Sequence, residues 1–346
     1  MSVSPRVLFV ADAGRAVGGG HVMRCLTLAG ALTRAGADCG FAATPEAGRV
    51  LDGFAGPEIR RFAAPSDDPA ALCALAAQAA RTWGASFAVL DHYGAGLGED
   101  AQLRAAAGRL LAIEDLRRKR DCDLLLDSNL GRSASDYPGA NALLGPDYAP
   151  VRPGFAARRA ACLARRGAGG EVLSVLVSLG LTDVGGITGR VVDAIMPLLG
   201  RLRLDVVLGA GAQSLAAMQH LADQDPRVSL HVDARDMDAL NADADLALGA
   251  GGSSAWERCV LGLPSVTLVL ADNQRENTLA LAAAGASLAL EVNGALSARL
   301  GEAFQSLTIS DKRRTRMSQA AARLCDGQGG ERVAARVLAL IAGAPA

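Results

Sequence analysis

Aromatic side chains are scarce in this chain, at 3% of its 346 residues, so small and aliphatic side chains must fill the interior. Half of the residues are hydrophobic, with many Ala, Leu, Val and Gly, as is typical of layered α/β proteins. An excess of positive charge is also missing, because 35 Lys and Arg stand against 36 Asp and Glu. This balance disfavours a nucleic-acid partner. The basic run at 117–120 is therefore expected to be a solvated face.

Paired cysteines and long apolar runs are absent as well. The seven cysteines include no Cys-x-x-Cys pair, and their odd number disfavours a disulfide framework or a zinc site. No apolar run approaches the roughly 20 residues that span a membrane, and no signal peptide precedes the first strand. We therefore expect a cytoplasmic protein with reduced thiols and no membrane partner. A monomer is the simplest state, although the sequence leaves the oligomeric state open.

Several nucleotide-binding and catalytic motifs do not occur. The chain has no Gly-x-Gly-x-x-Gly fingerprint and no Gly-Lys-Ser/Thr phosphate loop, which argues against NAD and ATP as ligands. It also lacks the Gly-x-Ser-x-Gly turn of serine hydrolases and the His-Glu-x-x-His pattern of zinc enzymes. We accordingly expect no cofactor and no metal, and chemistry supplied by side chains alone.

Short apolar runs recur along the chain, and most of them end in polar or glycine residues. In the first half the runs at 7–10 and 87–90 predict buried strands, and in the second half the runs at 172–178 and 246–248 do so. Further strands are expected at 39–43, 110–113, 123–126, 204–208, 228–232, 265–270 and 286–290. Helical segments separate most of these strands. That alternation predicts parallel sheets, in which ligands bind at the carboxyl ends of the strands.

The pattern predicts an α/β protein of two Rossmann-like, doubly wound domains that face each other across a cleft. Residues 1–155 would form the N-terminal domain, which ends in a loop rich in proline and glycine at 145–155. Residues 156–326 would form the C-terminal Rossmann-like domain. Residues 327–346 would form a final helix that packs back on the N-terminal domain.

A glycine loop with a histidine follows the first predicted strand. Residues 18–24 read Gly-Gly-Gly-His-Val-Met-Arg, and a helix follows them. Backbone N–H groups at such a loop and helix start favour an anionic ligand. Because an unperturbed histidine has a pKa of about 6.5, His21 could take a proton from water near neutral pH. We therefore predict that His21 is the catalytic base, and an incidental loop histidine is the alternative.

A second glycine loop, Gly-Ala-Gly-Gly-Ser-Ser at 249–254, follows the predicted strand at 246–248 and precedes another helix. Glycines let a backbone approach phosphate closely, and serine hydroxyls can donate hydrogen bonds to it. The residues expected to hold a diphosphate are Gly251, Gly252, Ser253 and Ser254. Glu257, one helical turn later, could accept hydrogen bonds from ribose hydroxyls. The alternative is a tight strand-to-helix turn with a surface glutamate.

Polar side chains crowd two other predicted strand ends. Residues 91–93 (Asp-His-Tyr) follow one strand, and residues 272–274 (Asp-Asn-Gln) follow another. The second group is suited to hydrogen bonds with sugar hydroxyls or amides. Taken by itself, the first group is better explained as a turn with a capping aspartate, and a helix N-cap is a second explanation of the other group that is compatible with sugar binding.

Six segments together resemble the hydrolases of the pseudaminic-acid pathway, in their order and approximate spacing. They are GGGHVMRCLTLA, VLDHYG, DSNLGR, GPDYAPVRPGF, GAGGSSAWERCVLGLP and LADNQ. Members of that family release UDP from UDP-2,4-diacetamido-2,4,6-trideoxy-β-L-altropyranose. They are similar in fold to the GT-B glycosyltransferases, including the transferase of peptidoglycan lipid II synthesis. The resemblance implies metal-independent, inverting hydrolysis of such a UDP-sugar to UDP and free sugar, within a pathway that supplies glycans such as those of flagellin.

The resemblance also implies roles for individual residues. His21 falls on the family's catalytic histidine, the loop 251–254 falls on its diphosphate loop in a UDP-binding domain, and Glu257 falls on its ribose-binding glutamate. The candidate sugar contacts are Tyr93, Asn273, Gln274, Arg24 and Asp12. Of these, the first two fall where the family contacts the sugar.

Three positions depart from the family pattern. Val10 and Gly14 stand where members commonly have an arginine and a serine around an aspartate, and Leu181 replaces a glycine two residues before Asp183. These changes affect secondary contacts to phosphate or sugar. The main alternative is a GT-B glycosyltransferase that passes the sugar of a UDP-amino sugar to an alcohol. A nucleotide-sugar binding protein without catalysis is a third possibility.

Overall fold

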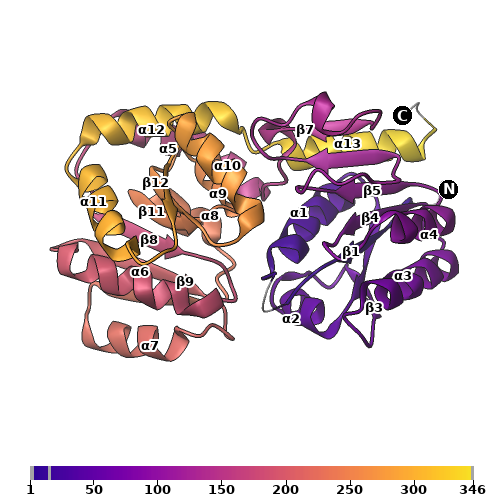
Figure 1. Ribbon diagram of the computed structural model, residues 1–346, viewed down its shortest axis with the longest axis horizontal. Coiled ribbons are helices and arrows are strands. Elements are labelled where there is room, and N and C mark those ends of the chain that lie inside the picture. The colour runs from indigo at the N-terminus through magenta and orange to yellow at the C-terminus, as the bar shows by residue number, and fades with distance from the viewer. Residues whose placement is uncertain (1–3, 15–16, 344–346) are drawn as a thin grey trace. The chain divides into compact units, whose positions relative to one another are not determined.

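The computed structural model describes residues 4–14 and 17–343, which divide into two compact units (Figure 1). One unit comprises the chain up to Pro150 together with the segment from Gln328 onward, and the other comprises Val151–Gly327. Each unit contains one parallel sheet with helices packed on both faces. The predicted α/β class with two Rossmann-like, doubly wound units is therefore confirmed.

The first unit is built on a parallel sheet in the order β3-β2-β1-β4-β5-β6-β7. Its strands are β1 (Arg6–Ala11), β2 (Asp38–Ala43), β3 (Arg60–Ala63), β4 (Phe87–Asp91), β5 (Leu110–Ile113), β6 (Leu124–Asp127) and β7 (Ala142–Leu144). Its α-helices are α1 (Gly20–Arg34), α2 (Pro45–Phe54), α3 (Pro69–Trp83), α4 (Leu97–Ala107) and α13 (Gly329–Ile341). Two single-turn 3-10 helices, η1 (Ala134–Asp136) and η2 (Pro146–Tyr148), lie beside β7 in the sequence.

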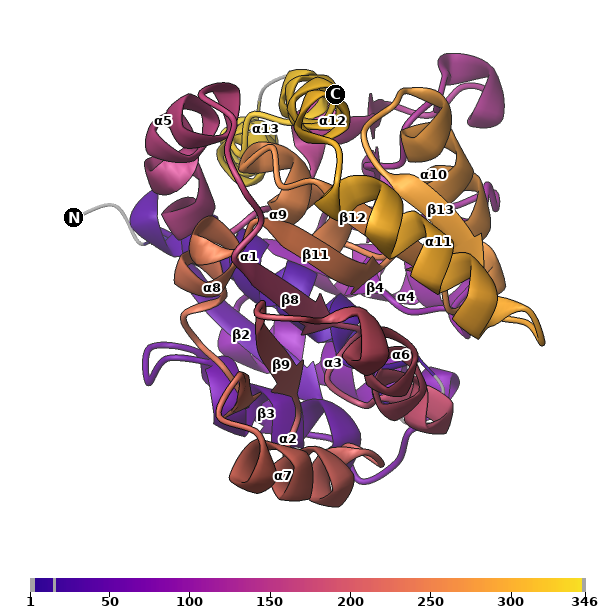
Figure 2. The ribbon, with the colours of Figure 1, turned by 90° about the vertical axis from the view of Figure 1, so that its left-hand side faces the viewer.

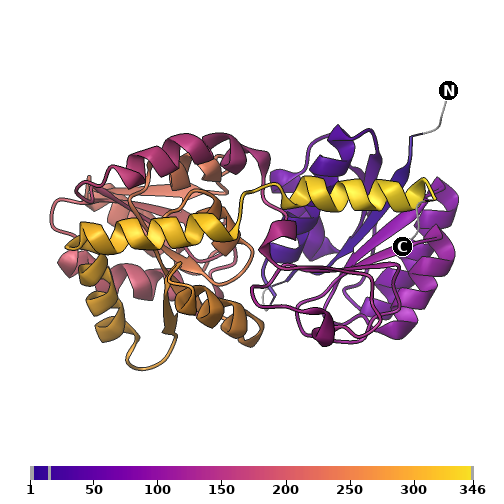
Figure 3. The ribbon, with the colours of Figure 1, turned by 90° about the horizontal axis from the view of Figure 1, so that it is seen from above.

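The side chains of strand β1 contribute to two hydrophobic cores, one on each face of the sheet. Val7 and Phe9 pack into a core with helices α1, α2 and α13, whereas Leu8 and Val10 pack into a second core with α3 and α4. Successive side chains of a strand point to opposite faces, so a continuous apolar run is required when both faces are covered. Helix α13, yellow in Figure 3, packs against α1 as part of the first core.

Local signals explain where two of these helices begin. Helices α2 and α3 both start at a proline, and the side chains of Thr44 and Asp68 accept hydrogen bonds from the backbone just inside them. The sequence analysis did not predict α2, β3, α4 or β7. Strand β3 is an edge strand whose side chains are mostly exposed, so it lacks the apolar run that marks a buried strand.

The second unit repeats the architecture with the sheet order β10-β9-β8-β11-β12-β13. Its strands are β8 (Ser174–Ser178), β9 (Arg203–Leu208), β10 (Val228–Val232), β11 (Leu246–Ala250), β12 (Ser265–Val269) and β13 (Leu288–Glu291). Its α-helices are α5 (Pro153–Gly167), α6 (Ile187–Ile195), α7 (Leu215–Gln224), α8 (Met237–Asp243), α9 (Ser254–Val260), α10 (Asp272–Ala283), α11 (Leu296–Thr308) and α12 (Asp311–Leu324). Its 3-10 helices are η3 (Val184–Gly186) and η4 (Met196–Leu198). Figure 2 shows α6 and α11 on one side of this sheet and α5, α8 and α9 on the other.

The strand orders identify where a ligand would bind in each unit. The chain reverses direction across the first sheet between β1 and β4, and across the second between β8 and β11. In open parallel sheets, ligands bind beyond the carboxyl ends of the strands at such a reversal. The first predicted glycine loop lies between β1 and α1, and the second begins in β11 and ends at α9, so each lies at the reversal point of its own sheet. His21 itself belongs to the first turn of α1 and not to the loop, because that helix begins at Gly20.

Candidate active site

A cluster of five polar side chains, the acid–base cluster, lies at the reversal point of the first sheet. Its members are His21, Arg24, Asp91, Tyr93 and Asp115. The first two lie in the opening turns of α1, three residues apart and so on one face of the helix. The other three follow or end the neighbouring strands β4 and β5. The parallel sheet therefore brings together residues that are up to 94 positions apart in the sequence.

His21 and Asp91 form the centre of this cluster. His21 Nδ1 lies 3.5 Å from Asp91 Oδ1, an ion-pair distance that is long for a hydrogen bond. The Arg24 guanidinium donates to both oxygens of Asp91, with Nε 2.5 Å from Oδ2 and Nη2 2.6 Å from Oδ1. The Asp91 side chain is thus fixed by a bidentate pair. His21 is 5% exposed and Asp91 is 1% exposed, so both groups are largely shielded from solvent.

Tyr93 and Asp115 close the cluster on another side. Tyr93 donates its hydroxyl to Asp115 Oδ2 at 2.9 Å, and Arg24 Nη1 lies 3.3 Å from the same oxygen. The Tyr93 ring meets the His21 ring edge-on, with 4.4 Å between the ring centroids. This contact restricts the orientation of the imidazole, which a group that transfers protons requires.

The surroundings of His21 and Asp91 favour the neutral form of the first and the ionised form of the second. Burial lowers the pKa of His21 below its ordinary value, and this effect outweighs the opposing attraction of Asp91. Burial alone would raise the pKa of Asp91, but the charge and hydrogen bonds of Arg24 hold it below its ordinary value. At neutral pH the cluster therefore contains an uncharged imidazole beside an ionised carboxylate. That pair can accept a proton from a hydroxyl.

Asp12 lies at the end of β1, next to a second histidine. His92 Nδ1 accepts a hydrogen bond from the Gly94 N–H at 3.0 Å, so the neutral ring carries its proton on Nε2. That nitrogen lies 3.8 Å from Asp12 Oδ1. The Asp12 backbone N–H also donates to the Asp91 carbonyl, which ties the ends of β1 and β4 together.

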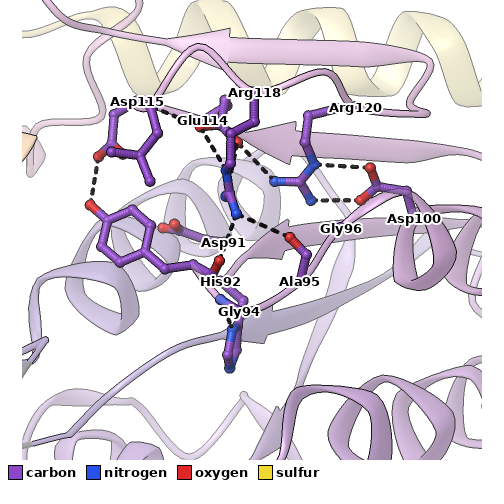
Figure 4. Close-up of polar contacts among 12 residues, drawn as sticks. Asp91, His92, Gly94, Ala95, Gly96, Asp100, Glu114, Asp115, Arg118 and Arg120 are labelled. Carbon is purple, nitrogen blue, oxygen red and sulfur yellow. Dashed lines mark hydrogen bonds and ion pairs between the residues drawn. The ribbon is translucent and has the colours of Figure 1, made fainter.

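A buried ion-pair network supports the segment that carries Tyr93 (Figure 4). Arg118 donates to the carbonyl oxygens of Tyr93, at 2.6 Å, and Ala95, at 3.2 Å. Glu114 accepts from both Arg118 and Arg120, and Arg120 also makes a bidentate pair with Asp100. The expectation of a solvated basic run at 117–120 was therefore wrong for Arg120, whose side chain is 1% exposed, whereas Arg118 is partly exposed. Periodicity and charge counts could not reveal that their carboxylate partners are buried.

The second glycine loop joins β11 to α9. The Gly251 N–H donates to the Leu268 carbonyl of β12 at 3.1 Å, so this amide is already used within the sheet. The next three residues, 252–254, are partly exposed and precede or begin α9. The first N–H groups of a helix have no partner within the helix. The predicted role in phosphate binding thus rests on Gly252, Ser253 and Ser254, and Gly251 would contribute through its lack of a side chain.

Packing beneath the loop explains why Gly251 must be glycine. A Cβ added there would overlap the Thr278 hydroxyl and crowd Gln274. We expect Gly251→Ala to lower the free energy of unfolding by about 1–3 kcal/mol, the usual result of overpacking, as measured by urea denaturation. Gly252→Ala is the matched control, because its Cβ would lie 3.7 Å from Gln274 Nε2, in ordinary contact. Equal stability of the two variants would contradict this prediction.

The other predicted contacts in the second unit lie near the same loop. Glu257 Oε1 accepts two hydrogen bonds from Arg152, which precedes α5, at 3.0 and 2.8 Å. Gln274 accepts from the Leu270 N–H at 3.2 Å, and its Nε2 faces Gly252. Asn273 lies in the first turn of α10. The predicted roles of Glu257, Asn273 and Gln274 toward ribose and sugar stay predictions.

The sequence analysis missed several partners of the predicted residues. It left Asp91 as a capping residue and named neither Asp115 nor Arg152 as functional. The signal that could have identified both aspartates was their shared position at the ends of predicted strands. Among residues 4–14 and 17–343, no group of three or more His, Cys, Asp or Glu side chains could hold a metal ion. In the same ranges no helix combines the length and the hydropathy that a membrane span requires.

Part of the chain matches a known glycosyltransferase domain. Residues 191–333 match the glycosyltransferase family 28 C-terminal domain. A UDP-N-acetylglucosamine--N-acetylmuramyl-(pentapeptide) pyrophosphoryl-undecaprenol N-acetylglucosamine transferase of Xanthomonas campestris pv. campestris is 31% identical over 236 residues, which cover 66% of this chain and 55% of the relative. The UDP-2,4-diacetamido-2,4,6-trideoxy-beta-L-altropyranose hydrolase of Campylobacter jejuni is 29% identical over 151 residues, or 43% of this chain and 50% of that protein. The chain thus spans about half the length of these curated relatives.

Solved structures agree with the fold. MurG of Acinetobacter baumannii superposes with a TM-score of 0.69 at 18% identity, covering 96% of this chain and 99% of that one. The two Rossmann-like units therefore have the GT-B architecture that the resemblance implied.

Proposed function

We propose that this protein is a UDP-sugar enzyme that breaks the bond between the anomeric carbon and UDP, and that it passes the sugar to an acceptor hydroxyl. The main observation in support is the neutral His21 beside the ionised Asp91, because such a pair can take the proton of an attacking hydroxyl. The match to family 28 and the transferase among the curated relatives support glycosyl transfer from a UDP-amino sugar.

The proposed reaction is a single displacement. The acceptor oxygen bonds to the anomeric carbon while the bond to UDP breaks, and the hydroxyl proton passes to His21 Nε2. Asp91 would then stabilise the imidazolium from the Nδ1 side. Attack from the face opposite UDP inverts the anomeric configuration. In the second unit, Gly252, Ser253 and Ser254 would stabilise the charge on the departing diphosphate, so the leaving group needs no general acid.

Hydrolysis of a UDP-2,4-diacetamido-2,4,6-trideoxyhexose is the second candidate function. It uses the same base with water as the attacking hydroxyl. Two observations favour it, namely the resemblance of six segments to the pseudaminic-acid pathway hydrolases and the partial match to the Campylobacter jejuni enzyme. Under this alternative the free sugar would enter pseudaminic acid biosynthesis in the cytoplasm.

One experiment tests both candidates. The purified protein is incubated with UDP-N-acetylglucosamine and, separately, with UDP-2,4-diacetamido-2,4,6-trideoxy-β-L-altropyranose, each with and without an undecaprenyl-pyrophosphoryl-N-acetylmuramyl-pentapeptide acceptor. UDP release and anomeric configuration are followed by NMR. Transfer predicts UDP release that depends on the acceptor and a product of inverted configuration. Release of free sugar without any acceptor would establish hydrolysis instead. UDP binding without turnover of either sugar would contradict both and indicate a binding protein.

A further inference from the structure

Arg258 lies beneath the glycine loop of the second unit and is 4% exposed. It belongs to α9, and its guanidinium reaches back toward the start of that helix. Nη2 donates to the Ala250 carbonyl at 2.8 Å, and Nη1 lies 3.3 Å from the Ser254 hydroxyl oxygen. A Cβ on Gly249 would overlap Nη1, so glycine at that position makes room for the guanidinium. The loop and the arginine are therefore packed as one structure.

This buried charge lacks an ionic partner. Within the described part of the second unit, no carboxylate lies within 4.0 Å of the Arg258 guanidinium. Its three hydrogen-bond partners are the neutral oxygens of Ala250, Ser254 and Thr267, and Nε has no hydrogen-bond partner at all. Burial lowers the pKa of Arg258 to about 10, which still leaves it protonated at neutral pH. By contrast, the buried Arg24 and Arg120 of the first unit each pair with carboxylates.

Burial of a charge without an ionic partner lowers the stability of a protein, so a buried arginine of this kind calls for a physical explanation. Arg166 offers a comparison in the same unit, since it is also buried and also bonds only neutral groups. Its partners are the carbonyl oxygens at the ends of α8 and α9, where the helix dipole favours a cation. Arg258 belongs to the last turn of α9, but its guanidinium reaches back to groups at the start of that helix, where the dipole favours an anion. Among the described residues its guanidinium thus has only neutral hydrogen-bond partners, and the nearby charge of Glu257 acts on it without a direct ion pair.

We propose that Arg258 is a positioning residue for the diphosphate of the nucleotide, and that it provides the buried counter-charge under the loop that would hold this group. The inference rests on the proposed function, because it assumes that the loop binds UDP. The bond to Ala250 keeps that carbonyl oxygen directed into the protein and away from an anion. The bond to Ser254 Oγ uses the hydroxyl as acceptor, which leaves its hydrogen to donate to a phosphate oxygen.

The test measures binding of UDP and of uridine by calorimetry to wild-type protein and to Arg258→Gln, Arg258→Lys and Arg166→Gln. Because hydrogen bonds that involve charged groups contribute about 10- to 100-fold in affinity, we expect Arg258→Gln to weaken UDP binding by that factor and to leave uridine binding unchanged. Arg258→Lys retains the charge and should recover part of the loss. Arg166→Gln controls for the loss of a buried arginine whose partners are carbonyl oxygens before β11 and at the end of α9, away from the glycine loop, and it should leave UDP affinity unchanged.

The outcomes separate this inference from the proposed function. Equal UDP affinity of wild-type protein and folded Arg258→Gln would overturn the inference while leaving the proposed function intact. A parallel loss of UDP and uridine binding would show that Arg258 only shapes the loop, which also overturns it. Wild-type protein that binds no UDP would overturn the proposed function and the inference together. If Arg258→Gln does not fold, Arg258→Lys is compared with wild-type protein instead. The inference then predicts that Arg258→Lys binds UDP more weakly than wild-type protein does and binds uridine equally well.

Discussion

Replacement of His21 with asparagine is expected to lower kcat for UDP-sugar turnover by about 10²- to 10⁴-fold, the usual contribution of a general base. Asparagine is similar in shape but cannot accept the proton at neutral pH. Affinity for UDP should change little, because the nucleotide is expected to bind the second unit. Steady-state kinetics and calorimetry on the variant measure the two quantities separately. Turnover equal to that of wild-type protein would refute the assignment of His21.

The pH profile provides an independent check on the same residue. Since burial lowers the pKa of His21, the imidazole is neutral over the physiological range and becomes protonated only below about pH 6.5. In wild-type protein, kcat/KM should therefore fall on the acid side below that pH, and the fall should disappear in His21→Asn. His220→Asn is the matched control, because His220 lies exposed on α7. It should retain both the rate and the acid limb.

Removal of the Asp91 carboxylate is expected to produce a large loss of stability in the first unit. Asp91→Ala leaves the Arg24 guanidinium without its bidentate partner, and breaking a buried ion pair in this way costs about 3–5 kcal/mol. Urea denaturation at neutral pH measures the difference. Asp52→Ala is the control in the same unit, because its pair with Arg61 is solvent-exposed and contributes about 1 kcal/mol or less. Similar losses in the two variants would contradict the prediction.

The stability of wild-type protein should also fall in acid, in a defined order. The pKa of Asp91 is depressed in the folded protein, so its contribution is present above the unfolded value of about 3.9 and is lost as the pH falls through the folded value. His21, whose pKa is also depressed, adds a loss that begins as the pH falls below about 6.5. The Asp91→Ala variant should lack the loss of stability that comes from Asp91 at low pH. The His21→Asn variant should lack the loss that begins below about pH 6.5.

Buried strands were predictable because each one appears in the sequence as a short run of consecutive apolar residues. In β1, for example, four consecutive apolar residues between polar or small ones admit few other interpretations. The short strands β3 and β7 lack a comparable apolar run, because an edge strand needs only backbone hydrogen bonds to one neighbour. Helix α4 has weakly segregated faces and begins at Leu97 after a glycine-rich turn, so its periodicity was faint.

Two kinds of signal pointed to the candidate site, namely glycines beside a side chain and the family resemblance, from which Arg24 and Tyr93 were named. His21 was identified through the glycines before it, and Ser253 and Ser254 through those around them. Asp91, Asp115 and Arg258 carry no such signal, because their roles depend on residues far away in the sequence or on what a neighbouring loop leaves open. Charge counting likewise could not distinguish Arg120, which is buried against Asp100, from an exposed arginine.

The return of the chain to its first unit has a consequence for synthesis. Val333, Val337 and Leu340 of α13 complete a core whose strands come from the first 150 residues. When Gly327 has just been added, every residue of the second unit has been synthesised, whereas the first unit still lacks the helix that covers the apolar surface of α1. The unit that is translated first is thus the last to be complete, and nascent chains that stall before α13 should be the form most exposed to chaperones and proteases.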